Sequence, residues 1–348
     1  MNTIKNLIRP NIQKMTAYSS ARSEFKGKTH ILLDANENPF NTMRKMNRYP
    51  DPLQWELKGR IGQLKKVAVE NIFLGNGSDE AIDLLIRIFC EPREDAIMVL
   101  PPTYGMYRVS AAVSDVEVQE VLLTTDYQLD VKAILEAVQP NTKLLFVCSP
   151  NNPTGNAFDL ELIEELLEGF EGIVVVDEAY IDFAGQDSCV SLLKAYHNLV
   201  VMQTFSKAWG LAGIRLGMAF AAEEIIDVLN KVKPPYNVNR LTQNAALKAL
   251  QSRDRFKRER NTILHERNIL SRGLQQLSFV EKVHPSDANF LLVKVKAAQE
   301  LYDYLKEKGI IVRNRSNVVL CEGCLRITVG TEEQNLELLE ALTKYGGR

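Results

Sequence analysis

The sequence predicts an α/β fold, because short apolar runs alternate with segments of helical periodicity through the middle of the chain. Three of these runs, at residues 96–100, 144–148 and 173–176, have the length of buried strands and lead within a few residues into polar side chains. Ligands of parallel sheets bind outside the carboxyl ends of the strands, so these polar ends predict a binding edge. With 348 residues, the chain is long enough for one large domain and one smaller domain.

Composition restricts the classes of function. Hydrophobic residues make up 45% and charged residues 25% of the chain, and the net charge of -2 favours neither nucleic acid nor an anionic membrane as a partner. No apolar run is long enough to span a bilayer, so we expect small-molecule chemistry in the cytoplasm. Five cysteines indicate reduced thiols, and the single C-x-x-C at Cys321–Cys324 has no second half-site, so no metal is predicted.

In chain order, the first forty residues form a poorly periodic arm that ends in a short predicted strand at 31–33 and a polar loop. A turn at 48–52 precedes a predicted helix over about 54–64. The segment Gly75–Glu80 then leads into an apolar helix that reaches Phe89. Glycines followed by Ser78 and Asp79 predict a helix N-terminus with open backbone N–H groups, which binds phosphate or is simply a capped helix end. The segment matches neither the dinucleotide nor the ATP phosphate-loop motif.

Asp177 follows four β-branched residues, so its carboxylate is predicted to be partly buried and to need a cationic partner. A pyridinium nitrogen is such a partner, and Tyr180 and Asn152 could then hydrogen-bond a ring oxygen while Tyr104 stacks on the ring. Taken singly, each has a plainer interpretation: a helix cap for Asp177, a core residue for Tyr180 and a turn residue for Asn152.

Lys207 and Arg215 lie among small residues directly after the apolar run 199–202. A lysine in a desolvated pocket near other cations loses its proton readily enough to form a Schiff base, and an arginine holds phosphate with a planar fork of donors. The pair therefore suits a carbonyl-bearing phosphate ester such as pyridoxal phosphate, although a solvated surface lysine is the plainer alternative.

Together, these segments resemble the class II, fold-type I aminotransferases in their order and spacing. The resemblance rests on 36–39, 48–50, 75–80, 149–155, 177–180, 206–207 and Arg215. It is strongest to the histidinol-phosphate aminotransferases, through 18–22, 233–239, 309–313 and 324–330. The resemblance implies a large pyridoxal-phosphate-binding domain (37–242) with a mostly parallel seven-stranded sheet between helices. It also implies an arm at 1–36 and a linking helix with a smaller α+β domain at 243–348. In that last part the sequence predicts strands at 290–295 and 325–329, a helix at 297–308 and a charged linking helix through 251–272.

The resemblance also implies a role for each site residue. Lys207 would bind pyridoxal 5'-phosphate covalently, Asp177 would pair with the ring nitrogen, Tyr180 and Asn152 would contact the ring oxygen, and Tyr104 would stack. The cofactor phosphate would be held by Gly77, Ser78, Asp79, Thr204, Ser206 and Arg215, and by Tyr49 from the second subunit of a homodimer. Arg326 would clamp the substrate anion, Arg313 and Tyr18 would contact the substrate phosphate, and Asn36 would flank the substrate.

The predicted activity follows from the resemblance. It is transfer of the amino group between L-histidinol phosphate and 2-oxoglutarate, giving imidazole acetol phosphate and L-glutamate, in histidine biosynthesis. Three alternatives stay open: an aromatic amino-acid aminotransferase, a decarboxylase of an amino-acid phosphate with the same fold, and a non-catalytic regulator that binds the cofactor.

Overall fold

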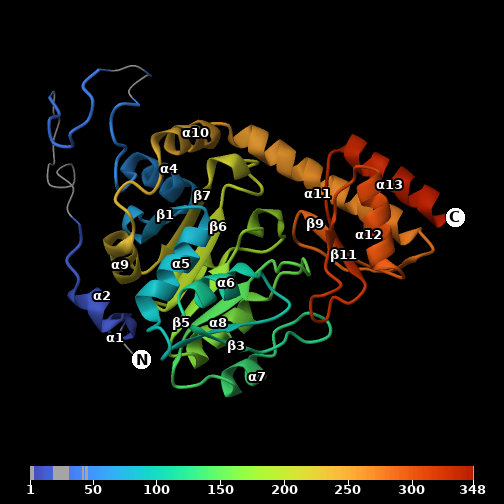
Figure 1. The fold of residues 1–348 in the computed structure, drawn as a ribbon, viewed down its shortest axis with the longest axis horizontal. Helices are drawn as coiled ribbons and strands as arrows, with labels where there is room; N and C mark the ends of the chain where they lie inside the picture. Colours follow the sequence, from blue (N-terminus) through green and yellow to red (C-terminus); the bar gives the residue numbers. More distant parts are fainter. Residues whose placement is uncertain (1–3, 19–30, 41–42, 44–45, 348) are drawn as a thin grey trace.

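The computed structural model describes residues 4–18, 31–40, 43 and 46–347, and its strands form two sheets (Figure 1). The large sheet has seven strands in the order β1-β7-β6-β5-β4-β2-β3. All adjacent pairs from β6 to β3 are parallel, and β7 alone runs antiparallel to its neighbours. The strands are β1 (Ile72–Asn76), β2 (Ala96–Val99), β3 (Glu117–Glu120), β4 (Thr142–Cys148), β5 (Ile173–Asp177), β6 (Leu199–Thr204) and β7 (Leu216–Ala221).

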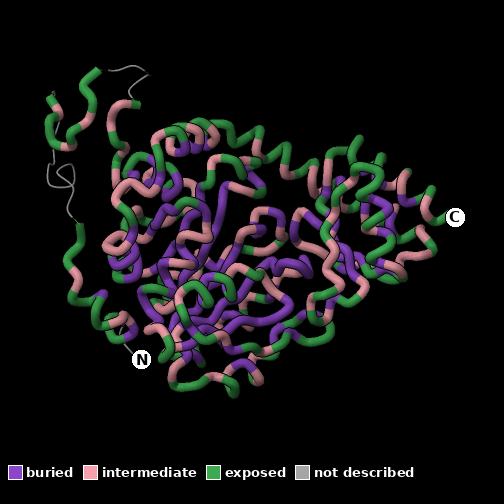
Figure 2. Tube along the Cα trace, in the orientation of Figure 1, coloured by how far each residue is buried: buried purple, intermediate pink, exposed green. Residues whose placement is uncertain are grey.

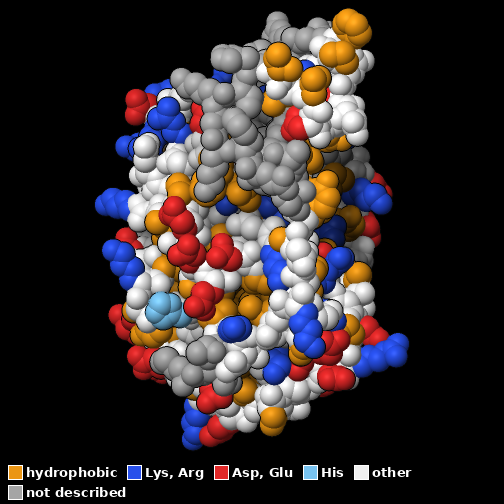
Figure 3. Space-filling view, turned by 90° about the vertical axis from the view of Figure 1, so that its left-hand side faces the viewer, with side chains coloured by type: hydrophobic (Ala, Val, Ile, Leu, Met, Phe, Trp, Pro, Cys, Tyr) orange, Lys and Arg blue, Asp and Glu red, His pale blue; other side chains and the backbone are white. Residues whose placement is uncertain are grey.

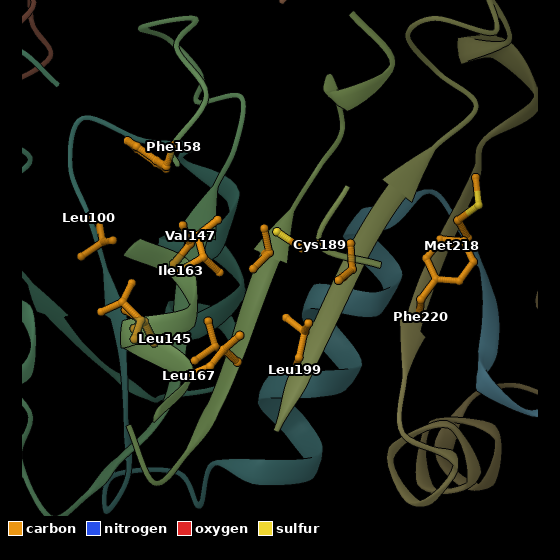
Figure 4. Packing of buried hydrophobic residues seen from close by; sticks show 14 of the residues in the cluster. Leu100, Leu145, Val147, Phe158, Ile163, Leu167, Cys189, Leu199, Met218 and Phe220 are labelled. Atoms are coloured by element: carbon orange, nitrogen blue, oxygen red, sulfur yellow. The ribbon is translucent and has the colours of Figure 1, made fainter. Parts of the chain in front are cut away.

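The central strands of this sheet are buried on both faces. Their side chains alternate between two hydrophobic clusters, as the two-residue period of a strand requires: Val174 and Val176 of β5 belong to one cluster, Ile173 and Val175 to the other. Helices on both faces explain why these strands are continuously apolar, without a polar side. Figure 4 shows the first cluster from close by, and Figure 2 shows the buried chain concentrated along the large sheet.

One face is covered by helices that share the second cluster with the sheet, and the opposite face by helices that share the first. The second-cluster helices are α1 (Ile4–Leu7), α2 (Pro10–Lys14), α5 (Ser78–Phe89), α6 (Met106–Val113) and α9 (Glu223–Val232). The first-cluster helices are α4 (Trp55–Lys65), α7 (Val131–Glu136), α8 (Leu160–Gly169) and α10 (Arg240–Leu250).

The second sheet is antiparallel, with the order β10-β11-β9-β8. Its strands are β8 (Val280–Val283), β9 (Phe290–Val295), β10 (Arg313–Asn314) and β11 (Cys324–Thr328). One face packs on α11 (Arg253–Gln275), α12 (Ala298–Glu307) and α13 (Glu332–Gly346) in a third hydrophobic cluster. Helix α11 runs from the large sheet to this second layer (Figure 1). Leu325 and Ile327 of β11 face the helices, so Arg326 between them faces the other side of the sheet.

The helices predicted near 54–64 and 297–308 and the strands predicted at 290–295 and 325–329 are confirmed within one or two residues. The strand predicted at 31–33 is wrong: the segment has no regular structure, because no strand of the described chain pairs with it, and Ile31 and Leu33 are exposed. The domain boundaries stay a prediction; the one at 242 falls inside α10, which packs on α4. Residues 19–22, which carried part of the resemblance, lie outside the described residues.

Candidate active site

A cavity of about 380 Å³ opens where the carboxyl ends of β4, β5 and β6 meet the second sheet. The large-sheet side also contributes the N-terminus of α5, and the second sheet contributes β10 and β11. Most of the predicted site residues line this one cavity: Ser78, Asp79, Tyr104, Asn152, Asp177, Tyr180, Thr204, Ser206, Lys207, Arg215, Arg313 and Arg326. They come from segments spread over about 250 residues of sequence, so the fold alone brings them together.

Asp177, at the end of β5, is buried and accepts two hydrogen bonds. The Tyr107 hydroxyl donates to its Oδ2 at 2.7 Å, and the Ala179 backbone N–H donates to its Oδ1 at 3.1 Å. Burial raises the pKa of the carboxyl to about 6, although the Tyr107 hydrogen bond acts in the opposite direction. The described residues give Asp177 no salt bridge, so its carboxylate has room for a cationic partner that comes from the cavity.

Lys207 follows β6 and lies on the cavity wall, with Nζ 5.5 Å from the centre of the Tyr180 ring. Partial burial lowers the pKa of its amine, and the positive charge of Arg326 lowers it further. A lysine amine of lowered pKa is a better nucleophile and base near neutral pH. The side chain is exposed in the chain alone, so the lowered pKa and the place on the cavity wall favour the Schiff-base role of Lys207, which stays a prediction.

Tyr180 and Asn152 connect the large sheet to the second sheet across the cavity. The Asn152 side-chain amide lies 3.5 Å from the Tyr180 hydroxyl, and its oxygen accepts a hydrogen bond from Nη1 of Arg326. The Tyr180 ring packs edge-on against Phe290 of β9, and the Arg326 guanidinium lies 5.3 Å from the centre of the same Phe290 ring. These contacts fix the direction of three polar groups that face the cavity.

The N-terminus of α5 forms the opposite end of the cavity and has no side-chain cap. Gly77 precedes it with a φ of +82°, a conformation that favours glycine. A Cβ on Gly77 would meet Nη2 of Arg215 at 2.7 Å, and one on Gly217 would meet the Ser78 backbone N at 2.2 Å. Thr204 and Ser206 lie alongside, with their hydroxyl oxygens 3.0 Å apart. Uncapped N–H groups, two hydroxyls and a guanidinium form a phosphate cradle.

Tyr49, Asn36 and Tyr18 do not line the cavity. Tyr49 is 47% exposed and stacks on Tyr236 with ring centres 4.4 Å apart. Asn36 lines a separate surface pocket beside Tyr49, and Tyr18 is 74% exposed. Their predicted contacts with cofactor or substrate stay predictions, and that of Tyr49 requires a second subunit.

The sequence prediction misses Tyr107, which is buried behind Asp177, and Arg315, which lines the cavity. Tyr107 lies three residues after Tyr104, on the buried side of α6, and its contact with Asp177 spans 70 residues of sequence. Arg315 lies two residues after Arg313 and lines the cavity with it. The alternation Arg-Asn-Arg at 313–315 is the one sequence signal that points to Arg315, because it places both arginines on one face of a strand.

Comparisons with known proteins agree with this geometry. The family model "Aminotransferase class I and II" matches residues 21–342. The chain belongs to this aminotransferase family. A relative from Parabacteroides distasonis named histidinol-phosphate aminotransferase is 55% identical over 98% of this chain and 99% of its own length. One of the same name from Cytophaga hutchinsonii is 53% identical over 99% of each chain. The crystal structure of the histidinol-phosphate aminotransferase from Clostridium acetobutylicum is 26% identical, with a TM-score of 0.81 over 87% of this chain and 92% of that one.

The cofactor of this aminotransferase is pyridoxal phosphate, and the cavity residues fit it. The phosphate cradle suits the phosphate, the buried Asp177 suits a protonated ring nitrogen, and the Lys207 amine suits the aldehyde.

Within the described part of the chain, no three His, Cys, Asp or Glu side chains are placed to hold a metal ion. Nor does any helix of the described ranges have the length and apolarity needed to cross a membrane.

Proposed function

We propose that this aminotransferase transfers the amino group between L-histidinol phosphate and 2-oxoglutarate, a step of histidine biosynthesis. The observation that carries the proposal is the cationic end of the cavity: Arg313 and Arg326 lie opposite each other on neighbouring strands and face the side that holds Lys207. That arrangement suits a substrate with an amine at one end and a phosphate or carboxylate at the other. Two nearly full-length relatives that carry the corresponding name support the same substrate.

The residues divide the work of the reaction. Bound pyridoxal phosphate supplies a ring that withdraws electrons from the substrate carbon bearing the amine. Asp177 keeps the ring nitrogen protonated through its buried carboxylate, which Tyr107 and Ala179 hold in place. With pyridoxal phosphate bound, the Lys207 amine, with its lowered pKa, would take the proton from the substrate carbon and return it to the cofactor carbon that bore the aldehyde. Arg326, held by Asn152, orients the substrate anion in both half-reactions.

A homodimer with shared active sites is part of the proposal. Tyr49 lies outside the cavity of its own chain, on a surface rich in exposed apolar residues. Met46 lines the same surface pocket as Tyr49, and the other exposed apolar residues between positions 31 and 55 are Ile31, Leu33, Phe40, Met43 and Trp55. Figure 3 shows hydrophobic side chains gathered on this face of the molecule. An exposed apolar surface of this kind is typical of a subunit interface.

We also propose that the protein is located in the cytoplasm. All five cysteines are buried free thiols, which is typical of proteins kept in a reducing compartment.

The amine donor is tested by assaying the purified enzyme with 2-oxoglutarate and three amines: histidinol phosphate, phenylalanine and threonine phosphate. We expect glutamate to form fastest with histidinol phosphate and no carbon dioxide to be released from any donor. Preference for phenylalanine would favour an aromatic aminotransferase, and release of carbon dioxide from threonine phosphate would favour a decarboxylase.

A further inference from the structure

Three arginines share one face of the second sheet. Arg313 on β10 lies directly opposite Arg326 on β11, and the Arg315 backbone N–H continues the pairing by donating to the Cys324 carbonyl oxygen at 2.9 Å. Side chains two residues apart on a strand lie on the same face, so Arg315 projects to the side of Arg313 and Arg326. All three line the cavity that contains Lys207.

The positive charge of this cluster is not balanced by the protein. Within the described chain, no carboxylate forms a salt bridge with any of the three arginines, and Arg326 donates to a neutral amide instead. The Nε atoms of Arg315 and Arg326 are buried without a hydrogen-bond partner. Burial, together with the charges of Arg326 and Arg313, lowers the pKa of Arg315 to about 10. Like charges on opposed strand positions destabilise a sheet, so the arrangement is favourable only when an anion binds.

Two guanidinium groups are sufficient for one carboxylate, which carries a single charge. A phosphate monoester carries nearly two charges at neutral pH and three acceptor oxygens. Three guanidinium groups therefore match the charge and the oxygens of a phosphate, whereas one carboxylate does not need the third group.

We propose that Arg315 is a specificity-determining residue that completes a three-arginine site for a doubly charged phosphate and so favours the phosphate-bearing substrate over the dicarboxylate. The inference rests on the proposed function, because it assigns the phosphate of the amine donor to this end of the cavity.

The test uses the enzyme loaded with pyridoxal phosphate, so that the cofactor's own phosphate site is filled. Arg315→Gln removes the charge, Arg315→Lys keeps the charge without the fork, and Arg272→Gln, on the exposed surface of α11, is the control. Single-turnover spectroscopy gives the specificity constant of each half-reaction. We expect Arg315→Gln to weaken the histidinol-phosphate half-reaction roughly 10- to 150-fold, the effect of one charge-assisted contact, and the glutamate half-reaction less than about threefold. Arg315→Lys should recover part of the loss.

A second readout does not depend on turnover. Without added anion, Arg315→Gln should melt at a higher temperature than wild type, because it relieves repulsion within the cluster. Inorganic phosphate should then raise the melting temperature of wild type clearly more than that of the variant, while acetate at equal ionic strength should raise both alike. Equal losses in the two half-reactions, or an equal response to phosphate, would overturn the role of Arg315. Wild type that fails to use histidinol phosphate would instead overturn the proposed function, and the melting experiment would still decide whether Arg315 binds phosphate.

Discussion

Asp177 combines two properties that rarely occur together: it is only 3% exposed, and it forms no salt bridge with any described residue, since Lys207 acts on it only from a distance. The Tyr107 hydroxyl and the Ala179 N–H satisfy part of its hydrogen-bonding capacity and leave the rest directed at the cavity. A buried carboxylate without a counter-ion is destabilising, so the fold retains it for the ligand and not for stability.

Because the charged form of Asp177 is destabilising when buried, the stability of the cofactor-free protein should depend on pH. The pKa of Asp177 is about 6 in the fold against an ordinary 3.8, so its contribution favours the fold below pH 4 and is lost as the pH rises through 6. Between pH 4 and 7, the free energy of unfolding of Asp177→Asn relative to wild type should rise by roughly 2 kcal/mol. Denaturant titration at several pH values measures the difference. The exposed Asp126→Asn is the control, and a flat difference for Asp177→Asn would show that no such cost exists.

The two predicted anion-binding arginines should differ in what they bind. Arg326, held by Asn152 near Lys207, should act in both half-reactions, whereas the more exposed Arg313 should act mainly on the phosphate. Arg326→Leu should then reduce both specificity constants, and Arg313→Leu should reduce that of histidinol phosphate by roughly 10- to 150-fold and that of glutamate clearly less. Single-turnover measurement of each half-reaction separates them, and equal losses in Arg313→Leu would show that it does not select phosphate.

At this scale, sequence reasoning finds residues that follow strands or glycines and misses residues that act through another side chain. Asp177 is recognisable because it comes directly after a buried apolar run, and Lys207 because it follows another such run within a few residues. Tyr107 is not recognisable, because its position is that of an ordinary core residue of an amphipathic helix. Only the packing of α6 on the large sheet directs its hydroxyl to a carboxylate.

Among the elements, α5 and β7 together shape the phosphate cradle. The close approach of Gly217 on β7 to the Ser78 backbone brings the N-terminus of α5 against the strand, and Gly77 turns the chain from β1 into α5. Both positions exclude side chains for steric reasons that depend on a neighbouring element. The sequence predicts the phosphate-binding helix end from 75–80 alone, but the role of β7 is evident only from the pairing of β1 with β7.

Gly77→Ala should weaken binding of pyridoxal phosphate. Its Cβ would displace the Arg215 guanidinium, and losing that charged contact should raise the dissociation constant roughly 10- to 150-fold. Gly309→Ala is the matched control, because Gly309 has a similar φ of +78° but an added Cβ there meets nothing within 4 Å. Absorbance titration of the apoenzymes with cofactor measures both. If the two variants lose equal affinity, backbone strain and not Arg215 is the cause.

The strands of the large sheet differ in how well the sequence predicts them. The central strands β2, β4, β5 and β6 are predictable as continuous apolar runs, because helices cover them on both faces. Strand β3, with the sequence Glu-Val-Gln-Glu, lies at the edge of the sheet and carries charges, so its composition does not differ from that of a loop.

For the whole molecule, the single chain holds a nearly complete site. The cavity joins residues from both sheets. Of the predicted site residues, Gly77 directly precedes the helix end that lines the cavity, and Tyr49, Asn36 and Tyr18 lie outside it. An exposed tyrosine stacked on Tyr236, amid other exposed apolar side chains, is well placed to reach a second molecule.

Sharing of sites between subunits can be tested by complementation. Mixing Tyr49→Phe protein with Lys207→Ala protein should give heterodimers in which one site carries both lesions and the other carries neither. Activity after subunit exchange should therefore exceed the average of the two parents. Subunit exchange is verified separately with differently tagged chains. If exchange is complete and activity does not exceed that average, Tyr49 does not complete a neighbouring site.

The alternation of β11 also bears on how substrate range can change over time. Leu325 and Ile327 support the core of the second sheet, whereas Arg326 between them, and Arg313 and Arg315 on the adjoining segment, line the cavity. Substitutions at the three arginines therefore leave the packing of this sheet on its helices intact. A lineage carrying this fold can acquire new acceptors or donors through these positions without first accumulating extra stability, and selection for a new substrate is not opposed by selection for folding.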